Sequence, residues 1–197
     1  MTIAIVDYGA GNLTSVKRAF DHLGETCTVT SNAAEVSRAT KIVLPGVGHF
    51  ATTAGLARSG VQLAIAQAID RGIPFLGICV GMQWMFTGSD ESSETRGLAL
   101  FPGNCVRFPA TVKSPHVGWN QLQISPSSRL FNGISDAPFV YFTHSYRAPL
   151  VDSTVACCEY GGQFSAAVER GHLFGVQFHP EKSGEVGLEI LRNFCKL

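Results

Sequence analysis

FLGICVGMQ, residues 75–83, is a short apolar run that ends at a cysteine with a glycine two positions away on each side, Gly77 and Gly81. The apolar run is typical of a buried strand. The pattern G-x-C-x-G is typical of a sharp strand-to-helix turn, whose central residue is strained and whose glycines let strand and helix approach each other. Such a turn puts the Cys79 thiol at the carboxyl end of a strand, where open α/β sheets bind ligands, and at a helix N-terminus, which favours the thiolate. The stretch predicts an α/β fold with a nucleophilic cysteine; the alternative is a buried cysteine in a glycine-rich corner.

Strands and helices alternate around this turn in the first half of the chain. The segments with a buried-strand pattern are 2–9, 26–30, 41–46 and 73–78. Those with a helical pattern are 12–24, 33–39 and 61–72. Alternating strands and helices, with strands that are apolar throughout, predict a parallel sheet covered by helices on both faces.

The second half changes character. From 97 to 160 the segments are shorter and richer in Pro, Gly and Ser, which predicts hairpins and sheet extensions with a surface connection at 125–138. Residues 165–183 have the pattern of a hairpin, and 185–197 that of a helix. We therefore expect one domain over 1–197 with a three-layer α/β fold, a mainly parallel central sheet and a smaller antiparallel extension in the second half.

Composition narrows the possible functions. Fifteen basic and 15 acidic residues give a formal charge of zero, so no basic excess favours binding to nucleic acid or a membrane surface. The apolar runs are shorter than the roughly 20 residues that span a bilayer. The N-terminal MTIAIVDYG lacks the basic head and cleavage site of a signal peptide. These features predict a cytoplasmic enzyme or binding domain.

Five of the six cysteines have no predicted chemistry. There is no C-x-x-C pair and no spacing typical of a zinc site or a disulfide framework, so we expect no metal. Apart from Cys79, the cysteines are expected to be small core residues: Cys27, Cys105, Cys157, Cys158 and Cys195.

A nucleophilic cysteine needs a base, and the base needs a group that orients it. His179 is the favoured base because GVQFHPEKS places it at the end of a buried strand, with Pro180 stiffening the turn before Glu181. A carboxylate there can accept from one imidazole nitrogen and leave the other facing the thiol. The alternative is a surface H-P-E turn. Together the motifs predict a Cys79–His179–Glu181 triad.

The other histidines compete less well for this role. His144, at the end of the aromatic strand YFTHSY, is the serious competitor, and His49 follows a glycine loop. His22, on the polar side of a helix, and His172, in a hairpin turn, are expected to be solvated.

The tetrahedral oxyanion formed in acyl transfer needs backbone donors. Val80, next after the cysteine, is placed to offer one N–H. LPGVGHF, residues 44–50, can offer another at Val47 or Gly48, because its glycines let a peptide N–H turn toward Cys79. The alternative is an ordinary loop. The G-x-G in DYGAGNLTS lacks the third glycine of a dinucleotide site, so nucleotide binding is disfavoured.

Six motifs then occur in a recognisable order: IVDYGAGNLTSV, LPGVGHF, LGICVGMQ, HVGWN, YFTHSY and GVQFHPEKSG. With them the chain resembles the triad, or class I, glutamine amidotransferases, and within that family the glutaminase subunits of imidazole glycerol phosphate synthases. The resemblance implies that Cys79 attacks the side-chain amide of glutamine, giving a γ-glutamyl thioester and ammonia, and that water then releases glutamate. No cofactor is implied.

The resemblance also assigns residues to the substrate. It implies that the Gln83 side chain, four residues after Cys79 and on the same helical face, holds the α-substituents of glutamine. The alternative for Gln83 is a solvated helix position. The other implied substrate-binding residues are Gly46, Gly48, Thr143, His144 and Ser145.

A partner is implied as well: a cyclase subunit with a (β/α)8 barrel, which would form a heterodimer with this chain and receive the ammonia. The glutaminase would be weak until the partner binds its ligand, with the PGVG loop rearranging. The interface residues implied by the resemblance are Asn12, Trp119, Asn120, Tyr141 and Lys182; the alternative for them is core packing. One departure is Ala99, which we interpret as a peripheral strand position where the family often has glycine.

Three other functions remain open. A free-standing Cys-His-Glu γ-glutamyl hydrolase would be fully active without a partner. A binding module that regulates a partner would be favoured only if a triad residue were missing. Glutaminase subunits for anthranilate, purine or pyridoxal phosphate synthesis usually lack the combination of HVGWN and HPEKS.

Overall fold

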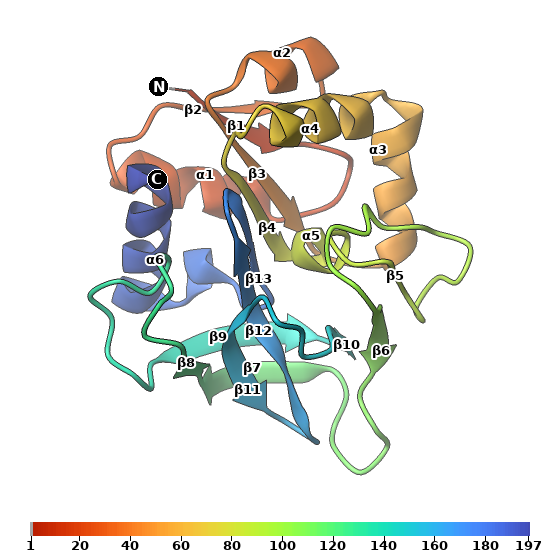
Figure 1. Ribbon diagram of the computed structural model, residues 1–197, viewed down its shortest axis with the longest axis vertical. Coiled ribbons are helices and arrows are strands. Elements are labelled where there is room, and N and C mark those ends of the chain that lie inside the picture. The colour runs from red at the N-terminus through yellow and green to blue at the C-terminus, as the bar shows by residue number, and fades with distance from the viewer. Residues whose placement is uncertain (1) are drawn as a thin grey trace.

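The computed structural model describes residues 2–197, in which a twisted eight-stranded sheet forms the centre (Figure 1). Its order is β2-β1-β3-β4-β13-β12-β11-β8. The first five strands are parallel and the last three antiparallel. Their bounds, in sheet order, are Cys27–Thr30, Ile3–Val6, Lys41–Gly46, Phe75–Cys79, Leu173–Val176, Gln163–Arg170, Thr154–Glu159 and Gln123–Ile124.

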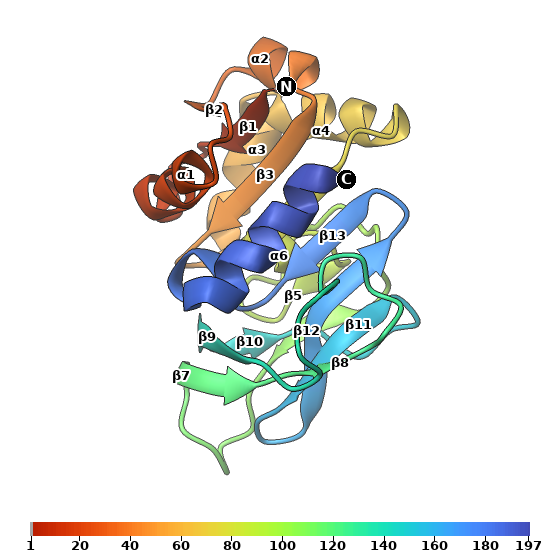
Figure 2. The same ribbon diagram turned by 90° about the vertical axis from the view of Figure 1, so that its left-hand side faces the viewer.

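Helices cover both faces of the parallel strands. α1 (Leu13–His22) and α6 (Gly184–Lys196) lie on one face; α2 (Ala33–Arg38), α3 (Ala54–Arg58) and α4 (Val61–Asp70) lie on the other (Figures 1 and 2). The strands between them are buried along their whole length in β1, β3, β4 and β13, as expected for a sheet covered on both sides. The predicted three-layer α/β fold is confirmed.

Two smaller sheets form the predicted antiparallel extension. β7 (His116–Gln121) and β9 (Phe139–His144) make an antiparallel ribbon that lies below the parallel strands of the main sheet in Figure 1. β10 (Tyr146–Arg147), β6 (Asn104–Arg107) and β5 (Gly88–Ser89) form a three-stranded sheet beside it. Two short 3-10 helices, η1 (Phe50–Thr53) and η2 (Pro180–Lys182), follow β3 and β13.

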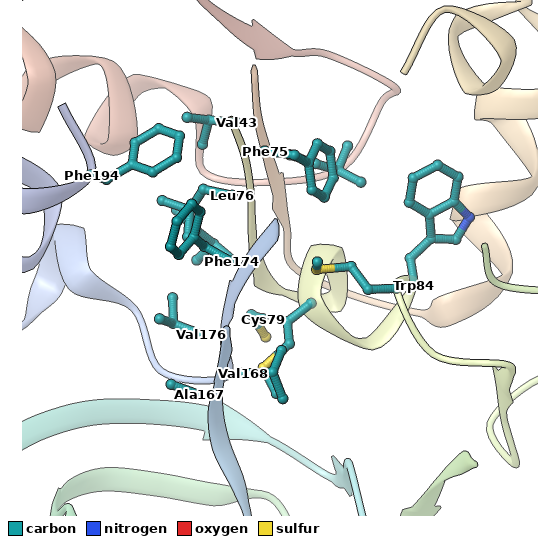
Figure 3. Close-up of a cluster of buried hydrophobic side chains, with 14 of the residues drawn as sticks. Val43, Phe75, Leu76, Cys79, Trp84, Ala167, Val168, Phe174, Val176 and Phe194 are labelled. Carbon is teal, nitrogen blue, oxygen red and sulfur yellow. The ribbon is translucent and has the colours of Figure 1, made fainter. Parts of the chain in front are cut away.

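The hydrophobic core lies around the central parallel strands. Figure 3 shows part of this buried cluster, in which Val43 of β3, Leu76 of β4 and Val176 of β13 lie with Phe194 of α6. Cys79 belongs to the same cluster and is 2% exposed. The predicted nucleophile is therefore held at the end of a buried strand within the hydrophobic core. None of the helices in residues 2–197 is long and apolar enough to cross a membrane.

Two segments outside the central sheet differ from expectation. The helix α3 and the preceding η1 were not predicted, because residues 50–58 lack a clear apolar periodicity. The 125–138 connection is not purely a surface loop: Leu130 and Phe131 are buried, and Asn193 Nδ2 donates to Leu130 O at 3.0 Å. Apolar side chains within the connection pull it onto α6.

The cysteine prediction is correct for three of the five. Cys105, Cys158 and Cys195 are buried, but Cys27 and Cys157 are only half-buried, and all six thiols are free. Successive side chains of a strand point to opposite faces, so Cys157 and Cys158 cannot both face the core. Cys157 Sγ instead contacts Gln123 Oε1 at 3.5 Å.

Ala99 is not in a strand, so that interpretation was wrong. It is an exposed residue of a loop with φ +53°, a left-handed conformation that costs most residues about 1–2 kcal/mol and glycine little. The conformation gives a physical reason for glycine at this position.

Candidate active site

The turn at Cys79 has the geometry that its glycines predict. β4 ends at Cys79 and a helix, α5 (Val80–Gln83), begins at the next residue. Cys79 has φ 55° and ψ −111°, a backbone conformation that residues other than glycine rarely adopt. A Cβ on Gly77 would lie 2.5 Å from Gly81 O, and one on Gly81 would lie 1.9 Å from Leu44 O. Both glycines are therefore required for β3, β4 and α5 to touch. The helix is four residues long.

His179 and Glu181 lie at the end of β13, the strand next to β4. His179 Nδ1 is 2.8 Å from Glu181 Oε1, and both side chains are 1% exposed. This pairing leaves Nε2 without a partner among residues 2–197, free to face the thiol. Burial alone lowers the pKa of His179, but the Cys79 sulfur and the Glu181 carboxylate act in the opposite sense and together raise it to about 10. The three predicted triad residues thus come together as a thiol, an imidazole and an orienting carboxylate.

The loop that holds His179 is anchored to the ribbon. His179 N–H donates to Tyr141 O at 2.9 Å, and Ser183 Oγ donates to His179 O at 2.7 Å. Tyr141 N–H in turn donates to Ser183 Oγ at 3.0 Å. The imidazole is therefore fixed by backbone bonds to β9 as well as by Glu181.

Gln177 is a site residue that the sequence reasoning missed. It is fully buried, and its Nε2 donates to Cys79 Sγ at 3.6 Å. Its Oε1 accepts from Gln83 Nε2 at 3.0 Å. A signal was present, because a polar residue two positions before His179 shares its face of an extended chain.

A cavity of about 190 Å³ opens at the thiol. This is smaller than the roughly 300–1,000 Å³ of pockets for drug-sized ligands and suits a molecule the size of an amino acid. Its lining residues are Gly48, Cys79, Val80, Gln83, Glu91, Pro115, Thr143, His144, Ser145 and Tyr146. The predicted oxyanion and substrate residues are therefore mostly gathered at one cavity.

Gly46 and Val47 do not line it. Gly46 is buried at the end of β3, opposite Cys79 in register, and a Cβ there would lie 2.5 Å from Tyr8 Oη and 2.7 Å from Val80 Cβ. Its glycine is needed for packing behind the turn. Gly48, with φ +99°, reaches the cavity and gives the loop the freedom that was expected of it.

Two acceptors face the cavity. Gln83, 2% exposed, is not solvated: its Nε2 donates to Tyr146 O at 2.9 Å and to Gln177, which leaves its Oε1 as the group free for a ligand. Glu91 was not foreseen, because an acid in the polar stretch DESSETRG looks like a solvated side chain. Its Oε2 accepts from Phe50 N–H at 2.8 Å, which ties the loop after β3 to the cavity wall.

The competing histidine is otherwise engaged. His144 Nδ1 is 2.8 Å from Tyr146 O, and its Nε2 is 3.2 Å from His116 Nδ1, so neither nitrogen is free to serve Cys79. His49 and His22 are exposed, and His49 Nδ1 accepts from Ala51 N–H at the start of η1. His172 is half-buried rather than solvated.

Three of the five predicted interface residues gather on one face. Trp119 and Tyr141 are opposite each other in the β7–β9 ribbon with ring centroids 6.1 Å apart, and Lys182 Nζ lies 5.8 Å from the Tyr141 ring. Trp119 is 56% exposed. Val117 and Phe139, which were not predicted, alternate with them on the same exposed face at 56% and 54%.

The two asparagines have internal partners instead. Asn12 Oδ1 caps α1 by accepting from Ser15 N–H at 3.3 Å. Asn120 is half-buried; its Nδ2 contacts His116 Nε2 at 3.4 Å and its Oδ1 accepts from Gln121 N–H. Residues 2–197 contain no group of three or more His, Cys, Asp or Glu that could hold a metal ion.

Comparison with known proteins agrees with this geometry. The model of the family "Glutamine amidotransferase class-I" matches residues 4–197, and the chain belongs to that family. It is 47% identical to the imidazole glycerol phosphate synthase subunit HisH of Moorella thermoacetica, over 99% of this chain and 94% of the relative. It is 45% identical to the subunit of the same name from Methanosarcina acetivorans, over 99% and 98%.

Solved structures share the fold at lower identity. The structure of PurLQS from Thermotoga maritima has a TM-score of 0.79 at 20% identity and covers 99% of this chain and 97% of its own. The glutaminase domain of CTPS from Trypanosoma brucei, solved with bound acivicin, has a TM-score of 0.69 at 18% identity, covering 100% and 94%. These likenesses concern the fold alone.

Proposed function

We propose that this chain is the glutaminase subunit of an imidazole glycerol phosphate synthase. As a single domain over 1–197 it hydrolyses L-glutamine to glutamate and ammonia, and passes the ammonia to a cyclase subunit in cytoplasmic histidine biosynthesis. The observation that carries the proposal is the strained Cys79 at an amino-acid-sized cavity, beside a buried His179–Glu181 pair. Similarity to HisH subunits over nearly the whole chain supports the choice among glutaminases.

The first half-reaction forms a thioester. The Cys79 thiolate attacks the side-chain carbonyl carbon of glutamine, and the oxyanion that forms is met by the N–H of Val80 and by one from the loop at Val47 or Gly48. His179, whose raised pKa keeps it protonated, gives its Nε2 proton to the departing amide nitrogen. The carbon–nitrogen bond breaks, and ammonia leaves while the γ-glutamyl group stays on sulfur.

The second half-reaction releases glutamate. A water molecule gives a proton to His179 Nε2 and attacks the thioester carbonyl. The carbon–sulfur bond then breaks, the sulfur leaves as thiolate, and the imidazolium is ready for the next cycle. Glu181 stays ionised and holds the Nδ1–H of His179 in both steps.

The cavity supplies groups that suit the α-carbon of glutamine. The Glu91 carboxylate and Gln83 Oε1 are acceptors for the ammonium group. Backbone N–H groups of residues 143–146, which also line the cavity, suit the carboxylate. These groups select an amino acid rather than a peptide, because a blocked α-amino group cannot offer three donors.

The β7–β9 face suits a protein partner. Exposed aromatic and apolar side chains with a lysine at the edge are typical of an interface core and its rim. We therefore propose that Val117, Trp119, Phe139 and Tyr141 dock the (β/α)8 cyclase, with Lys182 beside them. Asn12 and Asn120 stay predicted interface residues, although their side chains also make hydrogen bonds within the chain.

The test is glutamate release by the purified chain, alone and with the cyclase partner plus the nucleotide ligand of that partner. We expect little activity alone, a steep rise with the liganded partner, and none in Cys79→Ala. Strong activity that the partner does not change would instead favour a free-standing hydrolase. Partner binding without glutamine hydrolysis under any condition would indicate a regulatory binding module.

A further inference from the structure

Two buried histidines face each other across the β7–β9 ribbon. His116 and His144 are directly opposite in register, and His116 Nδ1 lies 3.2 Å from His144 Nε2. The His116 ring stacks on Tyr160 at a centroid distance of 3.9 Å and on Phe142 at 4.8 Å. Stacking accounts for an aromatic ring at position 116, but it does not account for a ring whose two nitrogens make hydrogen bonds.

The hydrogen-bond partners fix the proton on each ring. Tyr146 O can only accept, so His144 Nδ1, 2.8 Å away, carries the proton. In a neutral imidazole the other nitrogen then accepts, so His116 Nδ1 must be the donor between the rings. His116 Nε2 is left to accept from Asn120 Nδ2 at 3.4 Å. Burial lowers the pKa of His116 to about 4 and that of His144 to about 3, so both rings are neutral near pH 7.

The chain of hydrogen bonds continues to the thiol. Tyr146 O also accepts from Gln83 Nε2 at 2.9 Å, and Gln83 Nε2 donates to Gln177 Oε1 at 3.0 Å. Gln177 Nε2 contacts Cys79 Sγ at 3.6 Å. Residues 143–146 of the cavity wall are therefore held between the histidine pair on one side and Gln83 on the other.

We propose that His116 is a positioning residue for glutamine: by donating to His144, it fixes residues 143–146 and Gln83 in the arrangement that binds the substrate. His116 does not line the cavity and acts only through its neighbours. The inference rests on the proposed glutaminase function and names a residue, outside the triad, that sets substrate affinity.

Removal of the donor has a defined consequence. A phenylalanine at position 116 keeps the stack but leaves His144 Nε2 buried without a partner, which is unfavourable. His144 would then turn to recover a hydrogen bond and release Tyr146 O. The cavity wall and Gln83 would lose a shared anchor, so glutamine binding would suffer more than the chemistry at Cys79.

The experiment uses the full chain with its cyclase partner and compares His116→Phe with His116→Asn. Phe keeps the ring, whereas Asn loses the ring but keeps an amide N–H near the place of Nδ1. We expect His116→Phe to raise the KM for glutamine about tenfold, which corresponds to a loss of about 1.4 kcal/mol of binding, with a smaller fall in kcat. His116→Asn should stay within about threefold of the wild-type KM although it is the less stable variant. If packing alone mattered, the less stable variant, His116→Asn, would also have the higher KM.

A matched control separates packing from hydrogen bonding. Phe164 lies against both rings, with centroids 5.4 Å from His144 and 6.3 Å from His116, and contributes no side-chain hydrogen bond. Phe164→Leu should lower stability and leave KM unchanged. A wild-type KM in His116→Phe, or an equal rise in Phe164→Leu, would overturn the inference.

A second measurement covers the case in which His116→Phe does not fold. Nitrogen-15 imidazole spectra of the Cys79→Ala chain report the tautomers of both rings as glutamine is added. A proton on Nδ1 of both rings, with shifts on glutamine binding, supports the network; a proton on His144 Nε2, or no shift, contradicts it. If the wild-type chain does not hydrolyse glutamine with its partner, and the Cys79→Ala chain does not bind glutamine, the proposed function fails rather than this inference.

Discussion

The turn at Cys79 and the β7–β9 ribbon both carry parts of the candidate site, but they hold them in opposite ways. At the turn, backbone touches backbone: Gly77, Gly81 and Leu44 leave no room for a side chain. On the ribbon, Trp119 and Phe139 are more than half exposed and contribute little to the core. Residues of the turn therefore determine the fold and position the Cys79 thiol together, whereas the exposed side chains of the ribbon contribute little to the stability of the fold.

The two regions also shift the pKa of their buried histidines in opposite directions. His179, which follows β13 beside the turn, has its pKa raised by Cys79 and Glu181 despite burial, and His116 and His144 in the ribbon have theirs lowered by burial. Charged neighbours favour the imidazolium, and an apolar aromatic surrounding favours the neutral ring. One imidazole is thus suited to donate a proton and the other two to hold a fixed hydrogen-bond pattern.

The largest effect is expected for the carboxylate of the candidate triad, Glu181. Glu181→Gln removes the charge that orients and stabilises protonated His179, and we expect kcat to fall by roughly 10²–10⁴-fold, as when the acid of a catalytic triad is neutralised. Partner-stimulated glutamate release measures it. Glu185→Gln makes an equal change of charge at an exposed position in the first turn of α6. It is the control and should leave kcat unchanged. A Glu181→Gln enzyme with wild-type kcat would remove Glu181 from the mechanism.

The second test concerns packing at the turn. Gly81→Ala would place a Cβ 1.9 Å from Leu44 O, so β3 and α5 must separate. We expect the free energy of unfolding to drop by about 3 kcal/mol or more, with loss of activity, as measured by denaturant unfolding. Gly55→Ala, whose nearest non-local atom lies at 3.5 Å, is the control and should be neutral or stabilising in α3. Equal stability of both variants would show that the turn is not constrained as described.

The ribbon should give the reverse result. Trp119→Ala is expected to weaken cyclase binding by about 2 kcal/mol, or roughly 30-fold in Kd, because exposed aromatic residues often dominate interfaces. Its free energy of unfolding should change by less than about 0.5 kcal/mol, because the side chain is exposed. Leu63→Ala, 62% exposed on α4, is the control and should affect neither. Titration calorimetry measures cyclase binding, and denaturant unfolding measures the free energy of unfolding. Unchanged cyclase binding by Trp119→Ala would show that the partner binds elsewhere.

The last expected effect is the pH dependence of stability that the ribbon histidines impart, which is small for any single pH unit. A histidine whose pKa falls from 6.5 to about 4 on folding binds protons more readily when unfolded, so stability is complete above pH 6.5 and is lost as pH falls toward 4. Replacement of His116 by Phe should reduce the slope of unfolding free energy against pH by up to about 1.4 kcal/mol per pH unit in that window.

The pH dependence of stability has the opposite sign for His179 of the candidate triad. The raised pKa of His179 gives a contribution that is complete below pH 6.5 and is lost as pH rises through about 10. Urea unfolding from pH 4 to 7 measures the slope of unfolding free energy against pH to which His116 contributes. His22→Gln, a substitution of an exposed histidine, is the control. An unchanged slope in His116→Phe would mean that His116 is not a buried neutral ring.

Local patterns in the amino-acid sequence were sufficient to predict several parts of this protein. Apolar runs separated by helical periodicity indicated the parallel sheet, and G-x-C-x-G indicated the strained turn, because glycines at those positions let a strand and a helix approach closely. HPE indicated the His179–Glu181 pair, since two residues separated by one proline are close in any fold. These inferences needed no knowledge of which strands are neighbours.

Contacts between distant segments could be learned only from the folded molecule. Gln177 and Cys79 are 98 positions apart, and their contact requires β13 to lie beside β4. Glu91 and Phe50, or His116 and His144, meet because of a loop path and a ribbon register that no local pattern specifies. The inward turn of Asn120 and the left-handed Ala99 were hidden for the same reason: a side chain's partner and a loop's backbone angle depend on the surrounding fold.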